Sequence, residues 1–151
     1  MRLLRSSQDS FLFQLGNREK KLLFDLLELY PWSQPHQLSK SANLPDLSAN
    51  QKLLEEALAE NQAENRKQWQ ALLADSKHFG RTERGWKLSL HSGEMESLLQ
   101  MLNDIRVGSW VALGSPEGRA QTVDEKTAPY LWAMEMAGFF QMNLLAAVDG
   151  Q

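Results

Sequence analysis

The sequence contains no cysteine, and this absence removes several kinds of chemistry at once. Disulfides, thiolate metal sites, iron–sulfur clusters and cysteine nucleophiles all require a sulfhydryl group, so none of them is available to this chain. A cysteine-free protein is also compatible with a reducing compartment. The N-terminal residues do not show the basic-then-apolar pattern of a secretion signal. We therefore expect a cytoplasmic protein.

Positive charge and long hydrophobic runs are also scarce. The chain has 16 Lys and Arg against 19 Asp and Glu, a net charge of −3. Phosphate-binding surfaces carry an excess of basic residues, so we expect no nucleic-acid partner. The most apolar run, Tyr130 to Ala147, is interrupted by Glu135, Gln141 and Asn143. A membrane span needs about 20 nearly uninterrupted apolar residues, so we interpret this run as a buried core helix and expect no membrane association.

Catalytic and metal-binding motifs are lacking as well. The histidines His36, His78 and His91 do not share a metal-ligand spacing such as His-Glu-x-x-His. The sequence has no Gly-x-Ser-x-Gly elbow, no Walker loop and no Gly-x-Gly-x-x-Gly fingerprint. We therefore predict no catalytic residue, no metal site and no cofactor. With 151 residues, 42% of them apolar, the chain can form a single domain over residues 1–151 with a substantial core.

Two segments follow the same plan, at a constant offset of 75 residues. In residues 13–29 and 88–104, a strand ending is followed by a capping residue, an acidic first turn and an amphipathic helix. Asn17 and Ser92 are the predicted caps, because their side chains can accept from free amides at the start of a helix. Glu19 and Glu94 suit the positive end of the helix dipole. The pattern predicts two strand-then-helix units packed around a shared core.

The rest of the chain completes an α+β fold that is mainly helical. We predict about four helices, at residues 17–30, 48–77, 93–113 and 127–147. The apolar side chains of Phe11, Phe13 and Leu15 alternate with polar ones, which indicates a strand. The predicted sheet is antiparallel and three-stranded, formed by an N-terminal hairpin (2–5 and 10–15) and strand 86–90. Residues 31–48 and 114–126 are predicted to be irregular loops, because proline, glycine and serine are frequent there.

A polar and aromatic cluster lies on the third predicted helix. Asn103, Arg106 and Trp110 are spaced i, i+3, i+7 and share one helix face, with Asp104 beside them. A guanidinium next to an amide and an indole can recognise a carboxylate or the backbone of a partner. The alternative interpretation is a structural network that ties this helix to the long second helix. From this cluster and the missing catalytic motifs we predict a non-catalytic protein-interaction or regulatory module with a protein partner. A homodimer that packs through apolar helix faces is compatible with this prediction.

Glu135 supports a second hypothesis. It lies within the apolar segment 132–136, where burial of an unpaired carboxylate would be costly. Either it faces solvent or pairs with an arginine, or it is a functional acid. In the second hypothesis, the chain is a small enzyme or ligand-binding protein with an inter-helix pocket that involves Asp104, Arg106 or Glu135.

Three segments resemble a known family. They are the hairpin with its leucine-rich helix (11–29), the segment Leu-Asn-Asp-Ile-Arg-Val at 102–107, and the start of the aromatic-rich last helix, Pro129-Tyr130-Leu131. In these segments the chain resembles the DUF2017 family of uncharacterised bacterial proteins. The resemblance implies a bacterial protein of unknown function, and because the family has no established activity, it implies no particular reaction or cofactor.

Overall fold

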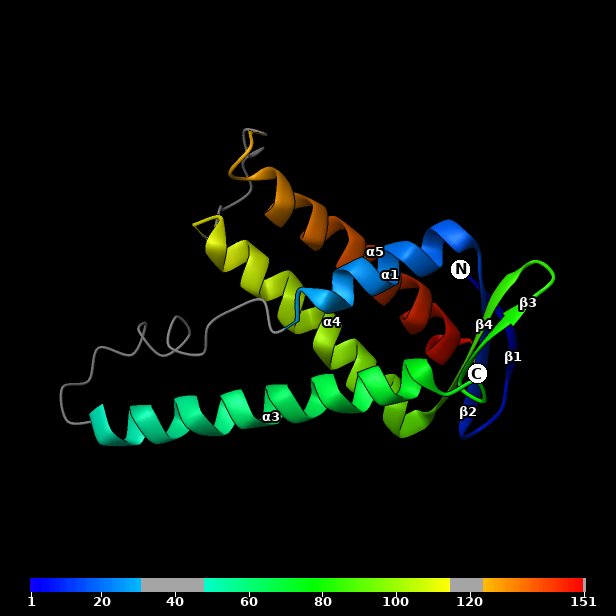
Figure 1. The fold of residues 1–151 in the computed structure, drawn as a ribbon, viewed down its shortest axis with the longest axis horizontal. Coiled ribbons are helices and arrows are strands. Elements are labelled where there is room, and N and C mark those ends of the chain that lie inside the picture. Colours follow the sequence, from blue (N-terminus) through cyan, green and yellow to red (C-terminus); the bar gives the residue numbers. More distant parts are fainter. Residues whose placement is uncertain (31–47, 115–123, 151) are drawn as a thin grey trace.

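The computed structural model of the protein describes residues 1–30, 48–114 and 124–150. Over these ranges the chain forms four helices and one four-stranded antiparallel sheet. The sheet lies at one end of the molecule, with the helices on one side of it (Figure 1). The prediction of a mainly helical α+β fold is confirmed. The predicted loops fall largely on residues 31–47 and 115–123, which lie outside the described residues, as does His36.

The strands are β1 (Arg2–Ser6), β2 (Ser10–Leu15), β3 (Phe79–Thr82) and β4 (Gly85–His91), arranged in the order β1-β2-β4-β3. Every neighbouring pair is antiparallel. Alternate side chains of β2 and β4 are buried against the helices, as the period of two predicts. They are Phe11, Phe13, Leu15, Leu88 and Leu90. β1 is the exposed edge of the sheet along its whole length.

The prediction of three strands is wrong, because it missed β3. The sequence pattern extends the second helix to Lys77, whereas the helix ends at Ala74 and residues 79–82 pair with β4. Only two residues separate β3 from β4, and Gly85 follows them with a φ of 136°. A Cβ atom at Gly85 would collide with the carbonyl oxygen of Leu15. Strand pairing and this glycine conformation, rather than an apolar pattern, define the missed strand.

The helices are α1 (Asn17–Glu28), α3 (Ser48–Ala74), α4 (Ser92–Ala112) and α5 (Ala128–Asp149). Leucines of α1 and α4 meet the inner face of the sheet and α5 in one apolar core. α3 differs from the others because its first half extends away from the body of the molecule (Figure 1). Leu53 and Leu54, in that half, are 64% and 54% exposed. Only the second half of α3 therefore contributes to the apolar core, with Trp69 as its buried apolar side chain.

Both repeated helices begin with a similar cap, one residue earlier than predicted. The N-caps are Gly16 and His91, not Asn17 and Ser92. The backbone N–H of each cap donates to a glutamate Oε1 three residues later, at 2.9 Å in both copies. In α4 the bond is reciprocal, because the backbone N–H of Glu94 donates to His91 Nδ1 at 3.3 Å. A glutamate at the third helical position is typical of a capping box.

The last helix is not buried on all sides, contrary to our expectation. One face of α5 packs into the core through Ala133, Ala137, Phe140, Leu144 and Ala147. The opposite side is exposed although it is also apolar: Phe139 is 37% and Met142 is 68% exposed. Among the described helices, α5 alone is long and apolar enough to cross a membrane by length and composition. A helix that is apolar all round has no polar side to indicate which face meets solvent.

Candidate functional site

All four predicted site residues are on α4, and three of them share one side of it: Asn103, Arg106 and Trp110. The guanidinium of Arg106 donates to Asn103 Oδ1 at 3.1 Å. Arg106 and Trp110 are exposed one turn apart and line a pocket of about 240 Å³, together with Val107 and with Met134 from α5. The hydrogen bond between Asn103 and Arg106 stays within α4, so it does not tie this helix to α3.

The fourth residue, Asp104, lies on a different side of α4. Two residues along a helix are about 160° apart around its axis, so Asp104 points away from Arg106. Its carboxylate accepts from Gln100 Nε2 at 3.0 Å, and burial raises its pKa while this hydrogen bond lowers it. It is close enough to Tyr30 to contribute to the raised pKa of that phenol, whose main cause is burial. Asp104 and Arg106 therefore do not meet in one site.

Glu135 is exposed on the outer side of α5. Of the alternatives stated for Glu135, the structure therefore shows a side chain that faces solvent. Its neighbour Met134 is the α5 residue that borders the Arg106 pocket. The pocket therefore combines a cation with apolar side chains.

An exposed apolar surface continues from this pocket along α5. Met134, Gly138, Gln141 and Leu145 are spaced i, i+4, i+7, i+11, which places them on one side of the helix. Met142 lies beside that line, whereas Phe139 is about 140° from Met134 around the helix axis and lies on another side of α5. We call this surface the α4–α5 face and define it by the pocket residues and two exposed side chains of α5. They are Arg106, Val107, Trp110, Met134, Met142 and Leu145.

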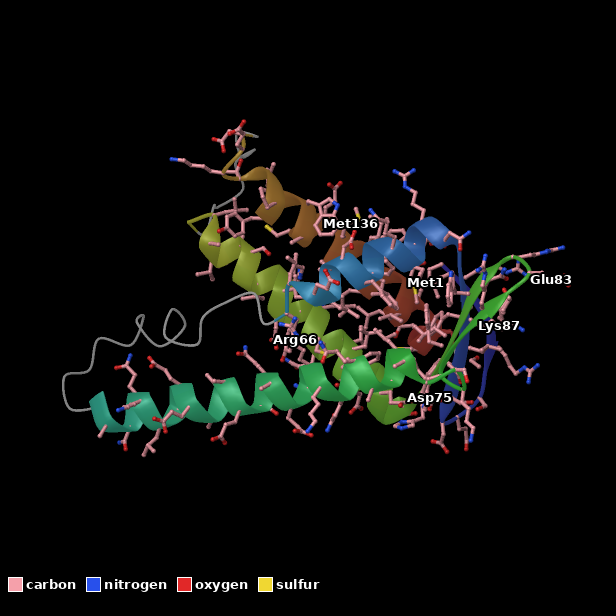
Figure 2. The ribbon with its side chains drawn as sticks, in the orientation of Figure 1. Met1, Arg66, Asp75, Glu83, Lys87 and Met136 are labelled. Carbon is pink, nitrogen blue, oxygen red and sulfur yellow. The ribbon has the colours of Figure 1, made fainter. Side chains whose placement is uncertain are left out.

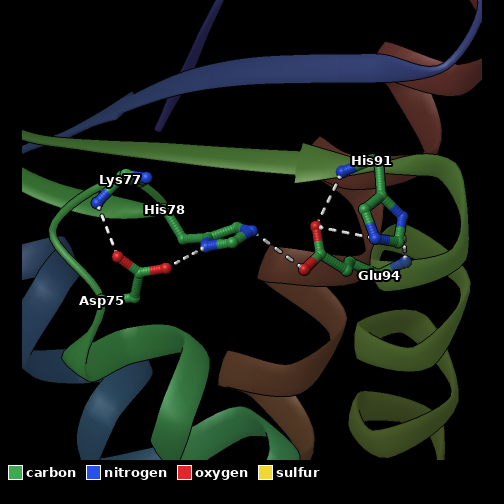
Figure 3. Close-up of polar contacts among 5 residues, drawn as sticks. All are labelled: Asp75, Lys77, His78, His91 and Glu94. Carbon is green, nitrogen blue, oxygen red and sulfur yellow. Dashed lines mark hydrogen bonds and ion pairs between the residues drawn. The ribbon is translucent and has the colours of Figure 1, made fainter.

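A second polar cluster, which the sequence patterns did not predict, lies at the sheet end of α3 (Figure 3). His78 lies between two carboxylates: its Nδ1 is 3.0 Å from Asp75 Oδ2, and its Nε2 is 3.2 Å from Glu94 Oε2. Glu94 also holds the capping bond with His91, so the chain of contacts runs from the end of α3 to the start of α4. These four residues line a pocket of about 460 Å³.

The geometry of this cluster favours a structural link. Both ring nitrogens of His78 are engaged, and the imidazole fills the space between the two carboxylates, so they do not converge on one point. Among the described residues, no three acidic or histidine side chains are grouped to hold a metal ion. The pKa of Asp75 is lowered, first by the backbone N–H of Lys77 and then by His78. The i, i+3 spacing of Asp75 and His78 was visible in the sequence, but the approach of Glu94 depends on the fold.

Comparison with known proteins gives no guide to the function of these clusters. No family model, curated protein or solved structure matches this chain. The resemblance to the DUF2017 family therefore stays a prediction. Any assignment of function must come from the surfaces and pockets of the molecule.

Proposed function

We propose that this protein is a cytoplasmic, non-catalytic module that binds a partner protein through the α4–α5 face. The observation that supports the proposal is the combination of exposed apolar side chains with one oriented cation. Val107 on α4 is 37% exposed, and Leu145 and Met142 on α5 are 47% and 68% exposed. Contiguous exposed apolar surface of this kind commonly marks a binding site.

The chemistry of the face favours one kind of occupant, an amphipathic helix with an acidic residue. The apolar side chains of such a helix recur at i, i+3, i+4 and i+7 and can pack along two neighbouring helices. Arg106 offers its planar guanidinium to a carboxylate, and the bond to Asn103 holds the side chain in place. The pocket beside it has room for one apolar side chain of the partner.

The charges of α5 argue against an anionic membrane surface as the occupant. Helices that lie on such surfaces are rich in Lys and Arg on their polar side. Residues 128–149 contain no Lys or Arg, and the exposed side of α5 carries the acidic residues Glu135 and Asp149. A protein partner is therefore the better complement to this face.

The proposal can be tested with helical peptides selected by display on the immobilised protein. We expect enriched peptides to carry an apolar stripe with an Asp or Glu beside it, and to bind at least about tenfold more weakly to Arg106→Ala, the cost of one charged hydrogen bond. Arg106→Lys should bind weakly as well, because an ammonium cannot form the two parallel bonds of a guanidinium. Met142→Glu should abolish binding, since it places a charge in the apolar contact.

The matched control is Leu54→Glu. Leu54 is also exposed, but it lies on the projecting half of α3, outside the face. Circular dichroism and thermal unfolding should show that all variants fold. Peptides that bind every variant equally would contradict the proposal. A concentration-dependent dimer in light scattering that Met142→Glu removes would assign the face to a second copy of the chain instead.

A further inference from the structure

A separate pocket lies between α1, α3 and α4, away from the α4–α5 face. Its volume is about 280 Å³. Leu27, Trp69 and Met101 are buried and form its apolar floor. Phe24, Leu73 and Ala74 form its walls, and the polar residues Glu28, Arg66 and Gln70 form its rim. Figure 2 shows Arg66 on the side of α3 that faces the other helices.

The pocket exists because polar contacts hold α3 on the body. Arg66 donates from its guanidinium to the carbonyl oxygen of Tyr30 at 3.0 Å. Trp69 donates from Nε1 to Ser97 Oγ at 3.1 Å. These bonds hold α3 against the helices that border the pocket. The pocket is therefore part of the folded structure.

The rim of the pocket carries two opposite charges on different helices. Glu28 is the last residue of α1, near the partly negative end of that helix, and Arg66 lies across from it on α3. Within the described ranges, the two side chains do not form an ion pair with each other. A simple anion would meet a like charge at Glu28, and a simple cation would meet a like charge at Arg66. A ligand with both charges complements the rim.

We propose that this pocket binds a free apolar amino acid. The ligand's carboxylate pairs with Arg66, its ammonium pairs with Glu28, and its side chain enters the apolar floor. The size of the pocket agrees with a compact ligand, because sites for drug-sized molecules span roughly 300–1,000 Å³. The inference is independent of the proposed protein-binding function, since it uses different residues on another side of the molecule.

The test compares leucine and phenylalanine with derivatives that lack one charge. N-acetylation removes the ammonium, and amidation removes the carboxylate. Binding is followed through the indole N–H signals in a nitrogen-15 NMR spectrum, assigned by Trp→Phe substitutions. We expect at least one free amino acid to shift the Trp69 signal saturably. The signal of Trp110, which lines the separate pocket of the α4–α5 face, should stay fixed. Each derivative should bind at least about tenfold more weakly than its parent.

Variants separate recognition of the charges from mere entry into an apolar hole. Arg66→Gln and Glu28→Gln should each weaken binding by at least about tenfold. Because Arg66→Gln also removes the bond to Tyr30, Leu73→Trp serves as an independent variant that fills the pocket and leaves both charges in place. Arg84→Gln, in the turn between β3 and β4, should bind like the native protein. Failure of both amino acids to shift Trp69, or equal binding of parent and derivatives, would overturn the inference.

Discussion

Replacement of Glu94 by alanine should destabilise the protein more than an ordinary surface substitution. One oxygen of this carboxylate accepts the backbone N–H of His91 at 2.9 Å and completes the cap of α4. The other lies 3.2 Å from His78 Nε2, which links the end of α3 to the start of α4. The side chain is only 18% exposed, so water replaces these contacts poorly.

The size of the effect follows from the two contacts. Loss of a helix cap costs about 1 kcal/mol. Loss of the contact between Glu94 and His78 costs about 0.5–1 kcal/mol. The free energy of unfolding should therefore fall by about 1.5–2 kcal/mol, if the two losses add. In a protein of this length each kcal/mol lowers Tm by about 2–4 °C, so we expect a fall of about 3–8 °C.

Urea unfolding followed by circular dichroism at neutral pH measures this change. The control is Glu96→Ala, two residues further along α4, where the side chain is exposed and the expected loss is below about 0.5 kcal/mol. Glu94→Gln should fall between the two, because its amide oxygen can still accept from His91. Equal destabilisation by Glu94→Ala and Glu96→Ala would refute the assignment of these contacts.

Three further predictions concern pH and backbone conformation. Because the pKa of Asp75 is lowered, its contribution to stability is present above the ordinary carboxyl pKa and is lost as pH falls through the folded value. The loss of unfolding free energy caused by Asp75→Asn, measured by urea unfolding, should therefore shrink below about pH 4. A loss that is independent of pH would contradict this. Burial raises the pKa of Asp104, so its charged form opposes folding as pH rises. The Asp104→Asn variant should therefore be no less stable than the native protein at neutral pH. It should also lower the pKa of Tyr30 in an ultraviolet titration. In urea unfolding, Gly85→Ala should lower the free energy of unfolding by more than about 2 kcal/mol because the new Cβ atom clashes with the backbone. Gly138→Ala, where a Cβ atom meets open space within a helix, should raise it by up to about 1 kcal/mol. Similar effects at both glycines would contradict this geometry.

Local sequence patterns predicted the elements whose signals are local. The alternation of Phe11, Phe13 and Leu15 identified β2, and the leucine pattern identified α1 and α4. The caps were predicted one residue late because the side-chain preferences of Asn17 and Ser92 outweighed the position of the glutamate. The spacing from Glu94 back to His91 indicates the correct N-cap, since the glutamate of a capping box is the third helical residue.

Features that depend on contacts between distant segments could not be predicted in this way. β3 is short and has one apolar side chain, Phe79, and its pairing with β4 makes it a strand. The i, i+3, i+7 spacing found Asn103, Arg106 and Trp110, but Met134 joins their pocket only through the packing of α5 on α4. Similarly, the exposed side of α5 is apolar at Phe139, Met142 and Leu145, so these side chains could not be distinguished from buried ones by composition alone.

Hydrogen–deuterium exchange of the native protein, with and without a selected helical peptide, tests the central proposal most directly. The account predicts that the bound peptide slows exchange in α4 around residues 103–110 and in α5 around residues 134–145, and that α3 and β1 are unaffected. Slowed exchange confined to α3 or β1, with the α4–α5 face unchanged, would contradict it.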